Sequence, residues 1–399
     1  MRGKSDFQPP MFFAIRIEDR IRVDHPLRAI KRRVDEELAR MGELFDKAYS
    51  ATGRPGVPPE RLLKAMLLQV LYSVRSETQL IERIDSDLLF RWFLEMDPAE
   101  AVFDQTAFTH NRPRLEEHGI IAAFFDGVVK RAMHAGLTSD EHFSVDGTLI
   151  ESHASIKSFV PRDQPQESKA PDNNRNHNNH NDGNTLPGGS NNSFKSRNAE
   201  VDFHGQKRSN ATHVSRTDPE ARLYKKGDGQ PALLYHTGHA IAENRNGLVM
   251  AVEVTEAAGD AEPAAALTMI DRLRSRLGVK VATLGSDKGY DSGPYLIELE
   301  NRHVEPHTAM KSGPVGGKGR REKKDLPLIE ARKRMEERTR GQRYSISQRC
   351  RKKIEEVFGW FKTVAGLYRT RLVGRWKLKQ QVQLAAAAYN LLRIRKLAG

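Results

Sequence analysis

The spacing of the apolar residues changes near residue 140, and this change is the strongest constraint on the fold. From about 27 to 135 the apolar residues recur three and four positions apart, which is the pattern of one helix face. Examples are Leu63, Met66, Leu67, Val70 and Leu71. After His142 they alternate instead, and the segment 143–146 predicts a short strand that ends near Gly147. We therefore expect a helical N-terminal part followed by a part that contains a sheet.

Two interpretations of the helical part remain open. Pro58-Pro59-Glu60 begins one helix, because proline suits the first helical turn. Arg112-Pro113-Arg114 precedes a further apolar stretch from Ile120 to Val129. The apolar stripes are either the core of a small helical bundle or part of a helix-turn-helix-type DNA-binding module. No recognition helix stands out, so the sequence favours neither.

Strands and helices alternate in the second half of the chain. Strands are expected at 233–242 and 248–255, joined in a hairpin by the turn at 244–247, and again at 279–286 and 304–310. Helices are expected at 261–277, 295–299, 346–363 and 377–396, with a basic loop or mobile helix at 311–343. This order predicts an α/β fold with a mixed sheet.

A polar tract interrupts the second half. Residues 172–192 consist mainly of Asn, His, Gly and Ser and cannot bury a core, so we expect a disordered surface insertion at about 160–200. His177 and His180 within it are far more often solvated than bound to metal. The predicted organisation is a helical domain at 1–135, for which DNA binding is one of the two interpretations above, an α/β domain at 136–380 and the end of a C-terminal helix at 381–399.

The overall charge limits the class of partner. The chain has 399 residues and a formal net charge of +13, which favours a polyanion such as nucleic acid over a membrane surface. No run of about 18 apolar residues predicts a membrane span. The first residues lack the apolar core of a secretory signal, so a cytoplasmic location is expected. The single cysteine, Cys350, excludes an internal disulfide and a cysteine-based zinc site.

Three acidic residues form a candidate metal site. Asp146 and Asp287 end predicted strands, where polar site residues often emerge in α/β sheets. On the helix at 346–363, with Arg351 at zero, Glu355 lies at roughly 40° and Lys362 at roughly 20°, beside the apolar stripe. Glu356 lies at roughly 140°, toward solvent. Three carboxylates suit two Mg²⁺ ions about 3.5–4 Å apart, the arrangement used to cleave phosphodiesters.

Ordinary structural roles compete with this interpretation. An aspartate at a strand end is usually a turn former or a helix cap, and a glutamate among basic neighbours is usually a surface ion-pair partner. We read Asp291 as a cap of the helix before Tyr295, and Asp218 as a turn former with Pro219. Taken singly, none of the three acids is decisive.

The sequence around these acids resembles a known family. In the segment 347–362, Arg351, Glu355 and Lys362 match the signature helix of bacterial insertion-sequence transposases of the DDE class, and Gln348 stands where that family has tyrosine. The resemblance to the insertion-sequence-five-like branch extends from about 50 to 395. Its further blocks are 53–72, 143–148, 217–227, 238–248 and 285–291, the last containing Asp-Lys-Gly-Tyr-Asp.

The resemblance implies an RNase H-like catalytic domain with Asp146, Asp287 and Glu355 as catalytic residues and ligands of two Mg²⁺ or Mn²⁺ ions. It implies that Lys288, Arg351 and Lys362 bind DNA phosphates. The substrates would be double-stranded DNA, namely terminal inverted repeats and target DNA, cut and joined by a homodimer associated with the bacterial nucleoid. Two alternatives are an RNase H-like nuclease without strand transfer and a catalytically inactive, DNA-binding descendant of a transposase.

Overall fold

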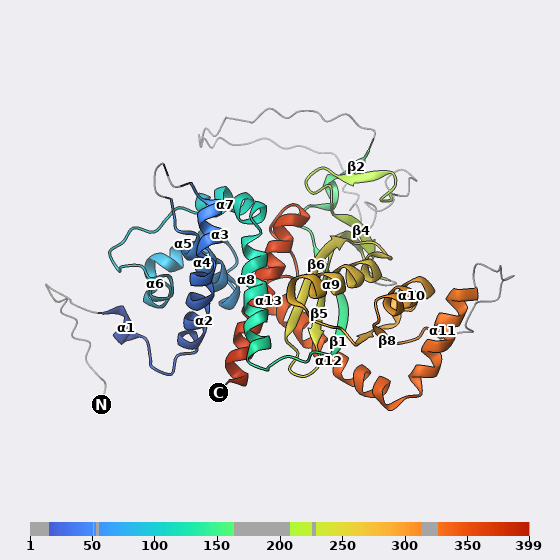
Figure 1. Ribbon diagram of the computed structural model, residues 1–399. Coiled ribbons are helices and arrows are strands. Elements are labelled where there is room, and N and C mark those ends of the chain that lie inside the picture. Colours follow the sequence, from blue (N-terminus) through green and yellow to red (C-terminus); the bar gives the residue numbers. More distant parts are fainter. Residues whose placement is uncertain are drawn as a thin grey trace, which may run out of the picture.

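The computed structural model describes residues 16–50, 52, 56–162, 208–225, 229–312 and 326–398. Its N-terminal part is helical, as predicted (Figure 1). The helices are α1 (Ile17–Arg20), α2 (Pro26–Arg40), α3 (Gly42–Ala48), α4 (Pro59–Leu71), α5 (Glu77–Ser86), α6 (Leu88–Leu94), α7 (Thr106–Glu117) and α8 (Ile120–His134).

Local sequence explains where several of these helices begin. Pro59 occupies the first turn of α4, as predicted. The side chain of Ser76 accepts a hydrogen bond from the Gln79 amide at the start of α5, and Asp87 does the same for Leu89 at the start of α6. Arg112-Pro113-Arg114 lies inside α7 and precedes α8, the helix of the predicted apolar stretch from Ile120 to Val129. The apolar stripe of α4 is buried, so these residues form core.

A mixed sheet occupies the second half of the chain. Its strands are β1 (His142–Glu151), β4 (Arg222–Lys225), β5 (Ala232–Glu243), β6 (Val249–Glu256), β7 (Thr283–Ser286) and β8 (Glu305–Thr308). The order is β4-β5-β1-β7-β8, with β6 also paired to β5. β1 and β6 run antiparallel to β5, whereas β7 runs parallel to β1 and β8 parallel to β7. β2 (Phe159–Pro161) and β3 (His213–Ser215) form a separate pair.

Five helices pack around this sheet. They are α9 (Ala261–Leu277), α10 (Gly293–Asn301), α11 (Leu326–Thr339), α12 (Gln342–Thr363) and α13 (Arg375–Leu397). α13 lies between the N-terminal helices and the sheet, in contact with α8 and with β6 (Figure 1). Its run of four alanines, 385–388, is fully buried and lets the neighbouring elements approach closely. One continuous hydrophobic core therefore joins the two parts.

Most predicted elements of this half are present, with different ends. The hairpin at 232–256 and the helix at 261–277 agree with the prediction. β1 does not end near Gly147 but continues to Glu151, because β5 pairs with it along its whole length. β7 is shorter than predicted, and α11 accounts for part of the basic stretch at 311–343. The tract containing His177 and His180 lies outside the described residues, and the domain limits at 135 and 380 stay predictions.

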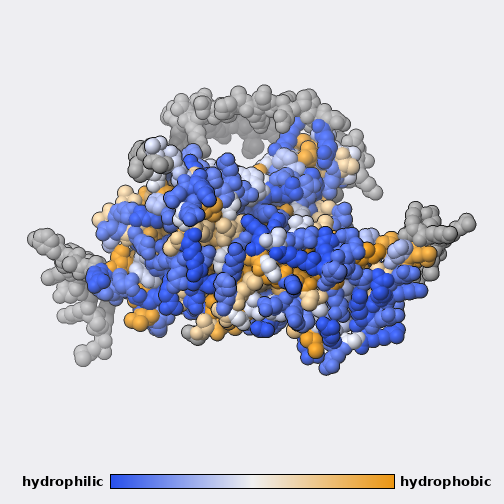
Figure 2. Space-filling model, viewed as in Figure 1, coloured by the Kyte–Doolittle hydropathy of each residue, from blue (hydrophilic) through white to orange (hydrophobic). Residues whose placement is uncertain are grey.

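None of the helices built by the described residues has both the length and the apolar character needed to cross a membrane. The face of the molecule in Figure 2 is largely hydrophilic, with smaller hydrophobic areas between.

Candidate active site

Strand register brings Asp146 and Asp287 together. β1 and β7 pair in parallel, with Ser144 opposite Gly285. Two residues further along the same register, Asp146 is opposite Asp287, which directly follows β7. Neighbouring strands lie about 4.8 Å apart, and residues at one register position point to the same face. The two aspartates are therefore neighbours, as the resemblance implies.

Glu355 and Arg351 approach Asp146 from α12. A guanidinium nitrogen of Arg351 lies 3.7 Å from Oδ2 of Asp146, and the other lies 3.5 Å from Oε1 of Glu355. The Glu355 side chain is 59% exposed, so it reaches the site from the solvent side. Glu356 faces solvent, as predicted, with 60% of its side chain exposed, and it forms an ion pair with Arg393 of α13 (N to O distance 3.0 Å). The two consecutive glutamates of α12 thus pair with different arginines, Glu355 with Arg351 and Glu356 with Arg393.

Negative charge accumulates around Asp146. Burial raises the pKa of its carboxyl to about 6, and the carboxylates of Asp287 and Glu355 add to this. The Gly147 amide, which donates to Oδ1 at 2.8 Å, and the Arg351 guanidinium act in the opposite direction. A cluster of like charges is unfavourable by itself and is stabilised by a cation.

A fourth carboxylate, Glu262, belongs to the same cluster and was missed by the sequence interpretation. It lies in the first turn of α9 and is half-buried. Burial, together with the carboxylates of Asp287 and Asp146, raises its pKa to about 7. The only signal in the sequence is an acid at the start of a predicted helix, which usually interacts with the helix dipole. Nothing in the spacing connects it to the other acids.

Two more of the predicted phosphate-binding residues lie on the segments that carry the acids. Lys288 is exposed and directly follows Asp287, and Lys362 is half-buried near the end of α12. Gln348 donates from Nε2 to the carbonyl oxygen of Ser286 at 3.2 Å, and also to that of His307. The residue that replaces the family's tyrosine therefore attaches α12 to the ends of β7 and β8.

Of two other acids, Asp291 has a role different from the one predicted, and Asp218 forms the predicted turn and has further contacts. Asp291 does not cap α10; its fully buried side chain accepts a hydrogen bond from the Lys311 amide and pairs with Arg332 at 2.7 Å. Asp218 is more than a turn former, because its buried carboxylate accepts hydrogen bonds from Ser152 Oγ and His236 Nε2, both at 2.8 Å. Tertiary contacts, invisible in the local sequence, decide both cases.

The donor set fits a hard divalent cation, since the cluster offers only carboxylate oxygens and lacks cysteine and histidine. Within the described ranges, no three acidic, histidine or cysteine side chains are already close enough together to hold a metal ion. The Arg351 guanidinium lies between Asp146 and Glu355 instead. Glu355 is the exposed member of the cluster, and its reorientation away from Arg351 would complete such a group.

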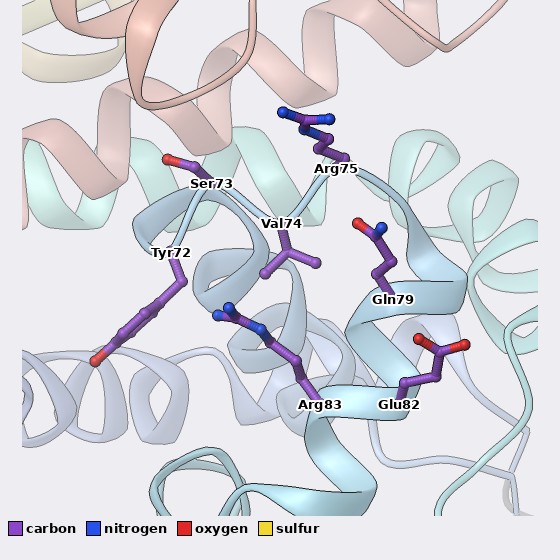
Figure 3. A pocket seen from close by; sticks show the side chains of 7 residues that line it. All are labelled: Tyr72, Ser73, Val74, Arg75, Gln79, Glu82 and Arg83. Atoms are coloured by element: carbon purple, nitrogen blue, oxygen red, sulfur yellow. The ribbon is translucent and has the colours of Figure 1, made fainter.

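A cleft of about 1030 Å³ lies between the α4–α5 turn and the segment 363–372 that joins α12 to α13. Its walls are connected by a hydrogen bond from Ser73 Oγ to the Val364 carbonyl oxygen, 2.8 Å. A smaller hollow of about 370 Å³ adjoins it on the N-terminal side and shares Ser73, Val74 and Arg75. In Figure 3, Arg75 points from the turn toward the C-terminal helices, drawn in pale red.

The strand order and the helical N-terminal part define an α/β protein with an RNase H-like fold. Comparison with protein families is more specific. Residues 15–114 match the family described as a transposase domain (DUF772), and residues 201–391 match the transposase DDE domain. Together the two matches support a DDE-type insertion-sequence transposase, an enzyme of DNA transposition and recombination.

The DDE match contains Asp287 and Glu355 and begins after Asp146. Enzymes of this class generally depend on divalent metal, and their substrate is DNA. Comparison with curated proteins gives no match, and comparison with solved structures gives none.

Proposed function

We propose that this transposase cleaves DNA at the ends of an insertion sequence and transfers the cut strands into target DNA. Asp146, Asp287 and Glu355 are its catalytic residues. The observation that supports this most is the parallel register of β1 and β7, which places two aspartates side by side beneath a glutamate-bearing helix. We also propose that the chain belongs to the insertion-sequence-five-like branch.

The three acids would hold two Mg²⁺ or Mn²⁺ ions, which when bound supply an activated water or hydroxyl and neutralise the leaving oxygen. Asp146 is fixed by the hydrogen bond from the Gly147 amide, and Asp287 by accepting a hydrogen bond from the Gly289 amide at 2.7 Å. These bonds orient the carboxylates before DNA arrives, so less ordering is needed on binding.

Basic residues on the same face would position the DNA. Arg351, which lies between two of the acids, would bind the phosphate next to the cut. Lys288 and Lys362 would bind neighbouring phosphates and release their counterions. The predicted partners are terminal inverted repeats and target DNA, and a homodimer would hold two element ends together. The N-terminal helices would contribute to end recognition.

A cleavage and joining assay tests this proposal. The purified protein is incubated with Mg²⁺ and duplexes that carry its element ends, and nicking is measured apart from joining of a pre-cut end. Asp146→Asn, Asp287→Asn and Glu355→Gln should each reduce both reactions to background and leave DNA binding intact. Equal loss of binding and cleavage would mean that the acids are structural.

The same assay separates the alternatives. An RNase H-like nuclease, or endonuclease without transferase activity, would cut the ends and fail to join the pre-cut one. A catalytically inactive descendant would bind the ends and do neither. Strand transfer that disappears with each acid supports the transposase.

A further inference from the structure

Glu262 approaches the catalytic aspartates from the opposite face of the sheet. Ser144 and Gly285 face α12, because a methyl group at Gly285 would lie 3.1 Å from Ser347 Oγ and 3.2 Å from Ser144 Oγ. Side chains alternate along a strand, so Asp146 also faces α12 whereas Gly147 faces the other side. There, a methyl group at Gly147 would lie 2.8 Å from Oε1 of Glu262.

Gly289, two residues after Asp287, also lies beside the Glu262 carboxylate. A methyl group at Gly289 would lie 3.3 Å from Oε2 of Glu262 and 2.9 Å from Oδ1 of Asp287. Gly147 and Gly289 thus leave room for one acidic group from α9 beside both aspartates.

The buried hydroxyl of Tyr290 lies beside this cluster. Tyr290 is fully buried, and its hydroxyl has no hydrogen bond among the described residues. It lies in the electrostatic field of Glu262, Asp146 and Asp287. A buried polar group without a partner requires an explanation, and a hydrated cation between the carboxylates would provide one.

We propose that Glu262 is a fourth acidic ligand of the divalent-metal site, reaching Asp146 and Asp287 past Gly147 and Gly289. This inference rests on the proposed function, since it assumes that the acids bind metal. The competing explanation is that Glu262 only stabilises the N-terminus of α9 through the helix dipole.

Mn²⁺ binding, measured by calorimetry and by electron paramagnetic resonance on the full chain without DNA, distinguishes these roles. Glu262→Gln should weaken Mn²⁺ binding about tenfold or more and raise the melting temperature without metal, because one repelling carboxylate is lost. Gly147→Ala should weaken Mn²⁺ binding similarly by displacing the Glu262 carboxylate. Glu43→Gln, a first-turn acid of α3 outside the cluster, is the control and should leave binding unchanged.

The outcomes separate the two proposals. If Glu262→Gln lowers the melting temperature without changing Mn²⁺ affinity, Glu262 is a helix-stabilising residue and this inference is wrong. If Asp146→Asn weakens Mn²⁺ binding and Glu262→Gln does not, the metal site stands with three acids. If neither changes the affinity, the metal site of the proposed function is itself wrong.

A second, independent inference concerns the cleft between the α4–α5 turn and residues 363–372. Its lining has four arginines and one carboxylate, Glu77, which pairs with Arg112. Arg369 pairs with Glu151 at 3.3 Å. The other two, Arg75 and Arg371, are exposed and have no hydrogen-bond or ion-pair partner within the described part of the chain.

Two elements lead from the acids to this cleft. Thr363, at the end of α12, lies eight residues after Glu355, about 12 Å along the helix. Glu151, which bridges to Arg369, lies five residues after Asp146, about 17 Å along β1. At about 3.4 Å per base pair, the cleft is about four or five base pairs from the acids.

We infer that this cleft binds the phosphate backbone of duplex DNA about four or five base pairs from the cleaved bond. Arg75 from the N-terminal part and Arg371 from the C-terminal part would hold the strand between them. The inference rests on the proposed function only for the position of the cut.

The salt dependence of binding to a duplex of arbitrary sequence tests it. Arg75→Ala/Arg371→Ala should reduce the slope of log affinity against log salt by about 1.8, since each phosphate contact contributes about 0.9. Arg32→Ala/Lys47→Ala removes the same charge from exposed positions on α2 and α3 and should change the slope little. Equal slopes for both double variants would refute the cleft assignment, and cleavage by the wild type would still support the proposed function.

Discussion

A single buried carboxylate, Glu243, organises the hairpin next to the candidate active site. It is fully buried at the end of β5. Its Oε2 accepts hydrogen bonds from the amides of Ser139 at 3.1 Å and Arg245 at 2.7 Å. Its Oε1 accepts from the amides of Asn246 at 2.7 Å and Leu248 at 2.9 Å. The carboxylate thus joins the β5–β6 turn to the segment that precedes β1.

We predict that Glu243→Gln lowers the free energy of unfolding by about 3 kcal/mol. The glutamine amide nitrogen cannot accept, so two of the four hydrogen bonds are lost. Each bond to a charged acceptor contributes about 1.5–3 kcal/mol. Part of this loss is recovered, because a buried charge no longer has to leave water. Even so, the loss is large beside a typical total stability of about 5–15 kcal/mol.

Denaturant unfolding followed by circular dichroism measures this effect. Glu117→Gln, at an exposed position near the end of α7, is the matched control and should change stability by less than about 0.5 kcal/mol. A change below about 1 kcal/mol for Glu243→Gln would mean that the four amides find other acceptors, and the reasoning would be refuted.

Three further predictions concern buried polar groups, each measured by the free energy of unfolding. Arg332→Met leaves the buried carboxylate of Asp291 unpaired and should cost about 3–5 kcal/mol; a loss below 1 kcal/mol would contradict this. Asn390→Ala removes two hydrogen bonds to the β6 backbone, of 2.9 and 2.7 Å, and should cost about 2–4 kcal/mol; an unchanged stability would show that water replaces them. The third substitution is Asp218→Asn. Burial raises the pKa of the Asp218 carboxyl, but its hydrogen bonds, of which the one from His236 has the largest effect, outweigh burial and hold the pKa below the usual 3.8. The stabilisation of the fold by the ionised Asp218 is complete above about pH 4 and is lost as the pH falls through the folded pKa. The difference in unfolding free energy between the wild type and Asp218→Asn should therefore shrink on acidification.

The sequence predicts the order of elements and most of the candidate site. The change from helical to alternating spacing near residue 140 separates the helical part from the sheet, because each periodicity reports one buried face. The helix phase relates Arg351 to Glu355, and α12 places both at Asp146. Local pattern is sufficient to identify these residues, because each has a definite position on its own strand or helix, but their meeting depends on strand register and on the packing of α12.

Contacts between distant segments decided the length of β1, the role of Asp291 and the position of Glu262. β1 extends to Glu151 because β5 pairs with it, and Asp291 is held by Arg332, which follows it by 41 positions. Glu262 joins the acids only because α9 crosses the face opposite α12, where Gly147 has no side chain. Such proximity depends on strand register and helix packing, which a local reading of the chain does not contain.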